Sequence, residues 1–199
     1  MNKSWGLAGC GILLLLATAF PASAAELRVS RDALERTLKQ QLFSSPDGRF
    51  YLKGSPRSAC SVYADDARVS FLQDRIIVKV KTRARMGKSV GGTCIGFSLS
   101  PVAEVSVAPY GEGESIGFRD AQLLKVSDRR ELNFLLTPFL SRQIPSSMKV
   151  DAADLLRKAL EGSTASSGYK VSLDRIKVHS MQIQGEVLVV DVDGDISVK

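Results

Sequence analysis

The chain has 199 residues, a net charge of +6 at pH 7 and 44% hydrophobic residues. This length suits one domain with a sizeable core. The chain contains a single histidine, which leaves little material for catalytic or metal sites built on histidine. The mild basicity favours anionic partners such as lipid head groups, although it is also common among soluble proteins.

The first two dozen residues have the pattern of a secretory signal peptide. Lys3 supplies a positive start, residues 11–20 form an apolar run too short to span a membrane, and Ala22-Ser23-Ala24 resembles a cleavage site. We therefore expect a signal peptide over 1–24 and a single domain over 25–199. The processed protein is expected to be soluble, and periplasmic or secreted.

Residues 29–43 predict the first helix. Ser30 is a suitable N-cap residue, and apolar residues recur every four positions along one side. That apolar stripe consists of Leu34, Leu38 and Leu42. A turn-forming segment over 44–48 ends the helix, and a short strand is expected over 50–52.

A hairpin is predicted from residues 67–72 and 75–86, with its turn at Gln73-Asp74. The second arm alternates between an apolar face and a basic face. The apolar face carries Ile76, Val78, Val80, Thr82, Ala84 and Met86. The basic face, called the basic stripe below, carries Lys79, Lys81, Arg83 and Arg85.

The longest alternation lies between Cys94 and Pro109. The apolar positions are Ile95, Phe97, Leu99, Pro101, Ala103, Val105 and Val107. A period of two over this length predicts one antiparallel strand of about 40 Å with one buried face. Such a strand needs an equally long element to cover its apolar face.

The next strand is expected over residues 114–126. Its alternation shifts phase between Phe118 and Ala121, which predicts a β-bulge near Asp120.

Two helices are expected after this strand. Asp128 and Glu131 approximate a capping box for the first, and Pro138 should kink or end it. Its apolar face consists of Leu132, Leu135, Leu136, Phe139 and Leu140. Asp151 caps the second helix, Gly162 is its expected end, and a flexible link is expected over 162–168.

The closing strands are expected over residues 169–183 and 185–199. Three acidic residues alternate around Gly194, but this glycine comes too early for a calcium-binding loop. The acidic residues are Asp191, Asp193 and Asp195. We therefore expect a hairpin turn at Asp193-Gly194. The order of elements predicts an α+β fold with an antiparallel sheet.

Cys60 and Cys94 are the two cysteines outside the predicted signal peptide. An even pair in an exported protein predicts a disulfide, which would contribute on the order of 3–4 kcal/mol. Two free buried thiols are the alternative. No metal site is expected, because two thiols and one histidine cannot complete a structural zinc site.

The sequence gives little support for catalysis. His179 has the surroundings of an ordinary strand residue, and no nucleophile motif accompanies it. We therefore expect neither enzymatic activity nor a cofactor.

The basic stripe has two interpretations. It is either a solvated outer face that also prevents edge-to-edge pairing of sheets, or a surface in transient contact with anionic membrane head groups. Nucleic acid is not an expected partner of a secreted protein whose basic face lacks interleaved aromatic residues.

The order of elements resembles that of small bacterial periplasmic lipoproteins with a tubular lipid-binding (TULIP-like) fold. The segments that carry this resemblance are VSRDALERTLKQQL, DARVSFLQDRIIVKVKTRARM, SLSPVAEVSVAP, SIGFRDAQLLKV, ELNFLLTPFLSRQIP and DAADLLRKAL. The likeness covers nearly all of the processed chain, in pattern and spacing. Family members carry an acylated cysteine at their processed start, whereas this chain has Ala25-Glu26 there, so no lipid tether is implied.

The resemblance implies a long helix in the concave side of a long, highly curved antiparallel sheet, with further helices between the main meander and the C-terminal strands. Lipid would lie in the apolar interior between helix and sheet. The implied lining residues are Leu34, Leu38, Leu42, Val78, Val80, Phe97, Leu99, Val105, Leu135, Leu136 and Phe139.

The predicted function is therefore that of a non-catalytic binding or carrier protein of the cell envelope for a lipid or other long apolar ligand. The alternative is a protein-binding module with a dry core, serving as an envelope assembly factor or inhibitor. Such a module would use an exposed strand edge or the loop at 88–93. Periodicity alone does not distinguish a cavity from a dry core.

Overall fold

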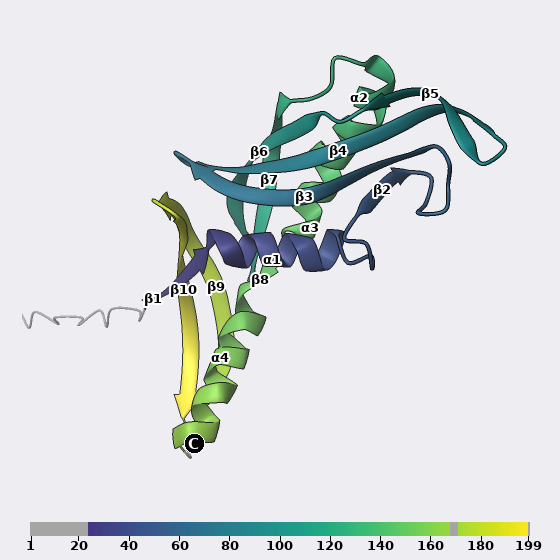
Figure 1. The fold of residues 1–199 in the computed structure, drawn as a ribbon. Coiled ribbons are helices and arrows are strands. Elements are labelled where there is room, and N and C mark those ends of the chain that lie inside the picture. The colour runs from purple at the N-terminus through teal and green to yellow at the C-terminus, as the bar shows by residue number, and fades with distance from the viewer. Residues whose placement is uncertain (1–23, 168–170, 199) are drawn as a thin grey trace, which may run out of the picture.

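The computed structural model describes residues 24–167 and 171–198 (Figure 1). The strands are β1 (Ala24–Ser30), β2 (Phe50–Lys53), β3 (Ser61–Leu72), β4 (Arg75–Val90), β5 (Thr93–Leu99), β6 (Val102–Glu112), β7 (Ser115–Lys125), β8 (Val150–Asp151), β9 (Val171–Gln184) and β10 (Val187–Val198). The helices are α1 (Arg31–Leu42), α2 (Arg130–Pro138), the π-helical turn η1 (Phe139–Gln143), α3 (Ile144–Ser147) and α4 (Ala152–Ser167). The predicted signal peptide lies outside the described residues except for Ala24, which opens β1.

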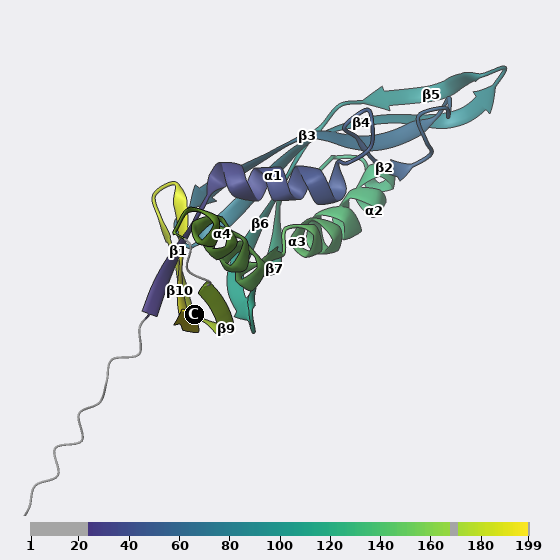
Figure 2. The ribbon, with the colours of Figure 1, turned by 90° about the horizontal axis from the view of Figure 1, so that it is seen from below.

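The described strands form two antiparallel sheets. The larger has the order β2-β3-β4-β6-β7-β8, with β5 also paired to β4, and the smaller has the order β1-β10-β9. Seen from below, α1, α2 and α3 lie across one face of the larger sheet (Figure 2). The α+β class with antiparallel sheets is thus confirmed. The expected single sheet is replaced by two, and the two longest described helices, α4 and α1, have 16 and 12 residues.

Helix α1 begins as the sequence predicts. The Ser30 hydroxyl oxygen accepts a hydrogen bond from the Ala33 amide at 3.2 Å, which satisfies one free donor of the first turn. Leu34 and Leu38 are fully buried, and Leu42 is partly buried against the same core. The amphipathic stripe therefore faces the core along the length of the helix.

The predicted hairpin is confirmed as β3 and β4, with Gln73 in the left-handed region at its turn. On β4 the apolar residues Ile76, Val78 and Val80 are fully buried. The alternate positions of the basic stripe are exposed. Strand alternation sorted these side chains correctly, because helices cover only one face of the sheet.

The prediction of one long strand over residues 94–109 is confirmed in part, because the strand is interrupted at Ser100-Pro101 and divides into β5 and β6. Pro101 has no amide proton for the ladder, but its carbonyl accepts a hydrogen bond from the Thr82 amide at 2.9 Å, which continues the register with β4 across the interruption. Strand β5 pairs with residues 84–90 of β4, and β6 pairs with residues 76–81 of the same strand. The apolar period spans the break, but only its second half is buried.

The predicted bulge at Asp120 is confirmed. Asp120 has φ of 53°, and the register between β6 and β7 shifts at this point. The Asp120 carbonyl accepts a hydrogen bond from the Arg75 guanidinium, which fixes the bulge against the start of β4.

The helices after β7 follow the expected order with different ends. Helix α2 begins without a side-chain cap, so the capping box at Asp128 is wrong. The Asp151 carboxylate does cap α4, since it accepts a hydrogen bond from the Asp154 amide at 2.8 Å. Helix α4 continues past Gly162 to Ser167, which overturns the expected stop and most of the flexible link. Residues 168–170 lie outside the described part.

Strands β9 and β10 confirm the closing pair, but their turn lies at Gly185, which has φ of 61°. The predicted turn at Asp193-Gly194 is wrong, because Gly194 lies inside β10 opposite Ile176. Strand β1, which the sequence analysis did not predict, pairs with the outer edge of β10. The two sheets are joined by a hydrogen bond from the Val178 amide to the Gly113 carbonyl, at 3.1 Å.

Candidate binding groove

An open groove of about 770 Å³ lies between β2 and the α2–η1 helical segment. Its apolar lining consists of Phe50, Leu52, Phe134, Leu135, Pro138 and Phe139. Its polar lining includes Arg130, Asn133 and Arg142. This volume lies within the usual range of about 300–1,000 Å³ for small-molecule sites.

The helical wall of the groove owes its shape to Pro138. A proline inside a helix removes one backbone donor, and here the helix widens into the π-helical turn η1 at the following residue. Phe139 begins that turn and stacks on Phe50 of β2, with ring centroids 5.0 Å apart and an interplanar angle of 20°. This aromatic pair joins the two walls of the groove.

The exposure of the apolar lining residues increases from the floor of the groove to its rim. Phe139 is 2% exposed, Leu135 is partly buried, and Phe134 on the outer side is 81% exposed. An apolar ligand that covers such an exposed aromatic side chain removes apolar surface from water, and this burial favours binding. The groove therefore offers both a packed floor and an uncovered aromatic rim.

The polar lining of the groove includes two exposed cations. The Asn133 amide nitrogen donates to the Ser127 carbonyl at 2.5 Å, while its buried oxygen Oδ1 has no hydrogen-bond partner among the described residues. Arg130 and Arg142 are exposed, and neither makes an ion pair with a described residue. The groove can thus receive an apolar chain together with an anionic group.

The residues predicted to line a ligand site are divided between three environments. Six are fully buried in the packed core: Leu34, Leu38, Val78, Val80, Val105 and Leu136. Leu135 and Phe139 line the groove, and Leu42 packs partly buried against the core. On β5, Leu99 borders a second hollow, while Phe97 is 38% exposed. Contact of any of these residues with a ligand stays a prediction.

Sequence reasoning missed Phe50, Leu52 and Phe134 as groove residues. Phe134 carried a usable signal, because it is an aromatic residue that falls off the apolar stripe of its own helix. The position of β2 opposite η1 had no such signal, since it depends on tertiary packing.

Acidic neighbours oppose most of the basic stripe. Lys79 contacts Glu104 at 3.1 Å, and Lys81 contacts Asp66 at 2.7 Å. The hydrogen bond from Lys81 is the main reason that the pKa of Asp66 lies below its ordinary value. These pairs are what a solvated outer face would form, and contact with membrane head groups stays a prediction for this stripe.

The second half of the stripe borders a hollow of about 420 Å³ on the outer face of the sheet. Arg83 lies 4.0 Å from Asp65, whereas Arg85 makes no ion pair with a described residue. Arg49 lies over the Tyr63 ring at 4.4 Å and also lines this hollow.

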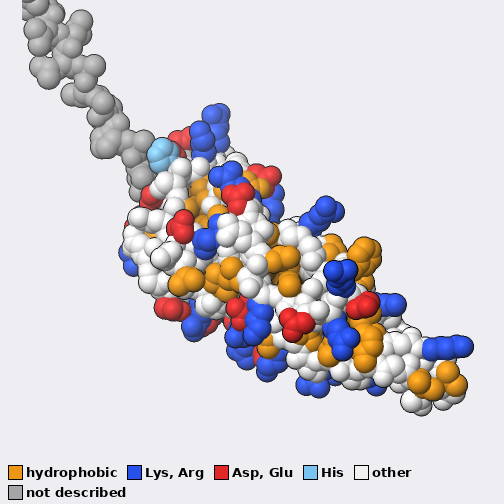
Figure 3. All heavy atoms as spheres, turned by 90° about the horizontal axis from the view of Figure 1, so that it is seen from above, with side chains coloured by type: hydrophobic (Ala, Val, Ile, Leu, Met, Phe, Trp, Pro, Cys, Tyr) orange, Lys and Arg blue, Asp and Glu red, His pale blue; other side chains and the backbone are white. Residues whose placement is uncertain are grey.

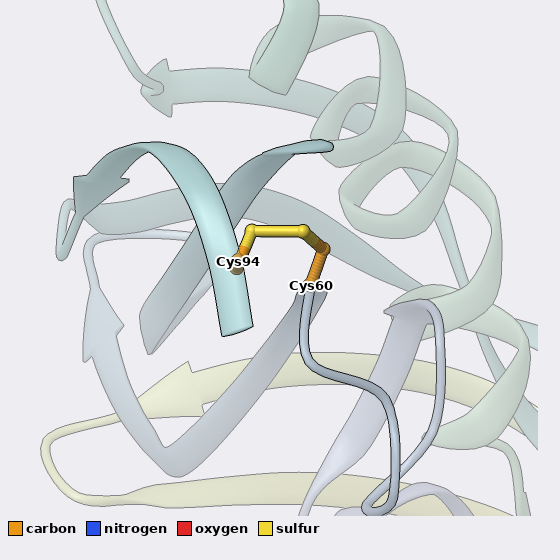
Figure 4. Close-up of a disulfide and its surroundings, with 2 residues drawn as sticks. All are labelled: Cys60 and Cys94. Carbon is orange, nitrogen blue, oxygen red and sulfur yellow. A yellow bond between two sulfur atoms is a disulfide. The ribbon is translucent and has the colours of Figure 1, made fainter. Parts of the chain in front are cut away.

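The predicted disulfide between Cys60 and Cys94 is confirmed, with an S–S distance of 2.01 Å (Figure 4). It joins the loop before β3 to the start of β5, and so ties the β4–β5 hairpin to a neighbouring segment.

His179 lies on β9 with 70% of its side chain exposed, and its Nδ1 is 3.6 Å from Asp193 Oδ2. Within residues 24–167 and 171–198, no cluster of three or more His, Cys, Asp or Glu side chains is placed to hold a metal ion. Across those same residues, no helix combines the length and the hydropathy needed to cross a bilayer.

Comparison with known proteins does not assign a family. No protein-family model matches this chain, and no curated protein matches it. Among solved structures, the crystal structure of a lipopolysaccharide binding protein aligns with a TM-score of 0.34 and 13% sequence identity. The alignment covers 87% of this chain and 50% of that protein, so the chain spans about half of that protein's length. This similarity is too low to support a function.

Proposed function

We propose that this chain is a non-catalytic binding or carrier protein for a lipid or another long apolar molecule, held in the groove between β2 and the α2–η1 segment. The predicted signal peptide and the Cys60–Cys94 disulfide fit a periplasmic or secreted protein. The observation that carries the proposal is the open aromatic lining, above all Phe134 with 81% of its surface exposed.

The energetics of the groove favour an acyl-type ligand. Each methylene group removed from water contributes about 0.8 kcal/mol, so an acyl chain needs few polar contacts to be held. Arg130 and Arg142 supply positive charge beside the apolar lining. A fatty acid or phospholipid has this combination of a long apolar chain and a polar, often anionic, end.

The proposal is tested by titrating a fluorescent fatty acid into the wild-type protein and a Phe134→Glu variant. The substitution places a charge in the groove at an exposed position, so folding should be unaffected and the affinity should fall by about tenfold or more. Leu155→Glu is the matched control, because Leu155 is a 43% exposed helical residue outside the groove. Equal affinities for all three proteins would contradict the proposal.

Strand β5 keeps the protein-binding alternative open. This strand pairs with β4 alone among the described strands, so its other edge is available to an added strand. Recovery of one stoichiometric protein partner, with no bound lipid, would favour an assembly factor or inhibitor over a lipid carrier.

A further inference from the structure

The end of the β4–β5 hairpin extends beyond the rest of the large sheet as a two-stranded ribbon (Figure 1). Strand β3 pairs with β4 only as far as Arg85, and β6 only as far as Lys81. Beyond Arg85, residues 86–90 and 93–97 pair with each other alone among the described strands. We call these two segments and their Gly91-Gly92 turn the ribbon.

The ribbon continues the apolar face of the sheet past the helices that cover it. By strand alternation, Met86, Lys88 and Val90 share the face of the buried residues Ile76 to Ala84, and Ile95 lies opposite Lys88. On the ribbon this face is open to solvent: Ile95 is 60% exposed, Val90 49% and Phe97 38%. Contiguous exposed apolar side chains of this kind mark a surface that binds another protein or a membrane.

The charge of the ribbon indicates which kind of partner binds this surface. Residues 86–97 of the ribbon contain one basic residue, Lys88, and no Asp or Glu. Lys88 lies among the apolar side chains and makes no ion pair with a described residue. In Figure 3 hydrophobic and basic side chains gather together at the narrow end of the molecule, over the ribbon. Apolar residues around an unpaired cation, without acids, match an anionic lipid surface.

Two structural constraints hold the ribbon in a defined conformation. The Cys60–Cys94 disulfide ties the start of β5 to the loop before β3. Gly87 and Gly96 face each other where the two backbones approach closely, since a Cβ at Gly96 would lie 2.1 Å from the Met86 carbonyl oxygen. These constraints hold a short hairpin that would be marginally stable by itself.

The ribbon also adjoins the binding groove. The Arg129 guanidinium lies over the Phe97 ring at 5.7 Å, and the next residue, Arg130, lines the groove. A membrane that covers Phe97 would therefore lie beside the groove wall formed by α2.

We infer that the ribbon docks the protein on an anionic bilayer, with Val90, Ile95 and Phe97 entering the head-group region and Lys88 contacting lipid phosphates. This inference rests on the proposed function for its purpose, because docking brings the groove to the source or destination of its lipid. The proposed membrane contact therefore lies on the face of β4 opposite the basic stripe, most of which is paired with acidic residues.

Flotation with vesicles of phosphatidylglycerol and phosphatidylethanolamine tests the inference. We expect the wild-type protein to bind these vesicles at low salt, and to bind pure phosphatidylcholine vesicles at least tenfold more weakly. Ile95→Asp should lower vesicle affinity by at least tenfold. Leu72→Asp is the matched control, because Leu72 is 59% exposed at the opposite end of the β3–β4 hairpin, and it should bind as the wild type does.

The outcomes separate docking from ligand binding. Ile95→Asp should keep its affinity for the fluorescent fatty acid, and Phe134→Glu should still float with vesicles. Absence of wild-type flotation, or equal flotation of Ile95→Asp and Leu72→Asp, would overturn docking while leaving the groove proposal standing. Capture of an envelope protein that depends on Ile95, without vesicle binding, would assign the ribbon to a protein partner and would also overturn the inference.

Discussion

Glu35 on helix α1 offers the sharpest test of how helix and sheet are held together. Its carboxylate is 13% exposed and contacts Lys39 Nζ at 2.6 Å and Arg68 Nη1 at 3.5 Å. It also accepts a hydrogen bond from the Val69 amide of β3 at 3.1 Å. Strand β2 covers β3 only over residues 62–64, so Glu35 satisfies a donor on the part of the edge that lacks a neighbouring strand.

Two substitutions separate the charge of Glu35 from its hydrogen bond. Glu35→Gln keeps an acceptor for the Val69 amide and loses two ion pairs whose cations are largely exposed, so we expect it to lower the unfolding free energy by about 1 kcal/mol. Glu35→Ala leaves the strand donor without a partner and should cost about 3 kcal/mol.

The effect of the charge should depend on pH. Burial alone would raise the pKa of Glu35, but hydrogen bonds from Lys39 and Val69 and the charges of Lys39 and Arg68 outweigh it and hold the pKa below the ordinary 4.5. A carboxylate with a lowered folded-state pKa stabilises the fold fully above its unfolded pKa, and this contribution is lost as pH falls through the folded value. The difference between wild type and Glu35→Gln should therefore be full at pH 7 and shrink below about pH 4.5.

Urea unfolding at pH 7, 4.5 and 3.5 measures this difference directly. The Glu35→Ala and Glu35→Gln proteins should rank in the stated order at pH 7. A wild-type advantage over Glu35→Gln that is the same at pH 7 and pH 3.5 would refute the electrostatic reasoning. Equal stabilities of Gln and Ala variants at pH 7 would refute the role assigned to the Val69 hydrogen bond.

Three further predictions concern the ribbon and the core. Replacing Cys60 and Cys94 by serine should lower the unfolding free energy by up to about 4 kcal/mol in calorimetry, because the bridge spans 34 residues; an unchanged Tm under oxidising conditions would contradict this. Gly96→Ala should speed amide exchange across the ribbon, whereas Gly91→Ala, with no atom within 4 Å of the added Cβ, should cost only about 1 kcal/mol of local backbone strain. Leu38→Ala should cost about 2–5 kcal/mol in urea unfolding yet leave fatty-acid affinity within twofold, since Leu38 is core; a selective loss of affinity would place the ligand in the core instead.

Local patterns in the sequence predicted the features that depend on a few neighbouring residues. The alternation of β4 identified its buried and exposed faces, and the phase shift in β7 located the bulge at Asp120. The Cys60–Cys94 pair followed from cysteine number and the expected export.

The predictions that failed concern features that depend on which other elements lie beside a strand. The apolar period through Pro101 survives the interruption because β5 and β6 pair with β4 in one continuous register, so alternate residues stay on the same face of the sheet. Ile95 fits the period and is nevertheless exposed, since none of the described helices covers that end of the sheet. The turn at Asp193-Gly194 failed because β10 continues through both residues in its pairing with β9.

The candidate site was predicted only in part for the same reason. The resemblance implied Leu135 and Phe139 as lining residues, and both line the groove. The opposite wall comes from β2, whose Phe50 stacks on Phe139 from a distant part of the chain. Core residues such as Leu34 and Val105 have the same spacing as groove residues, and only packing separates the two groups.

Native mass spectrometry of the protein purified from the cell envelope without detergent shows directly whether the groove holds a lipid. We expect a reproducible added mass that solvent extraction releases as a phospholipid or fatty acid, and that is reduced in the Phe134→Glu variant but retained in Leu155→Glu. A bare polypeptide mass, two hydrogens light for the disulfide and unchanged by incubation with lipid, would contradict the account and favour a protein partner.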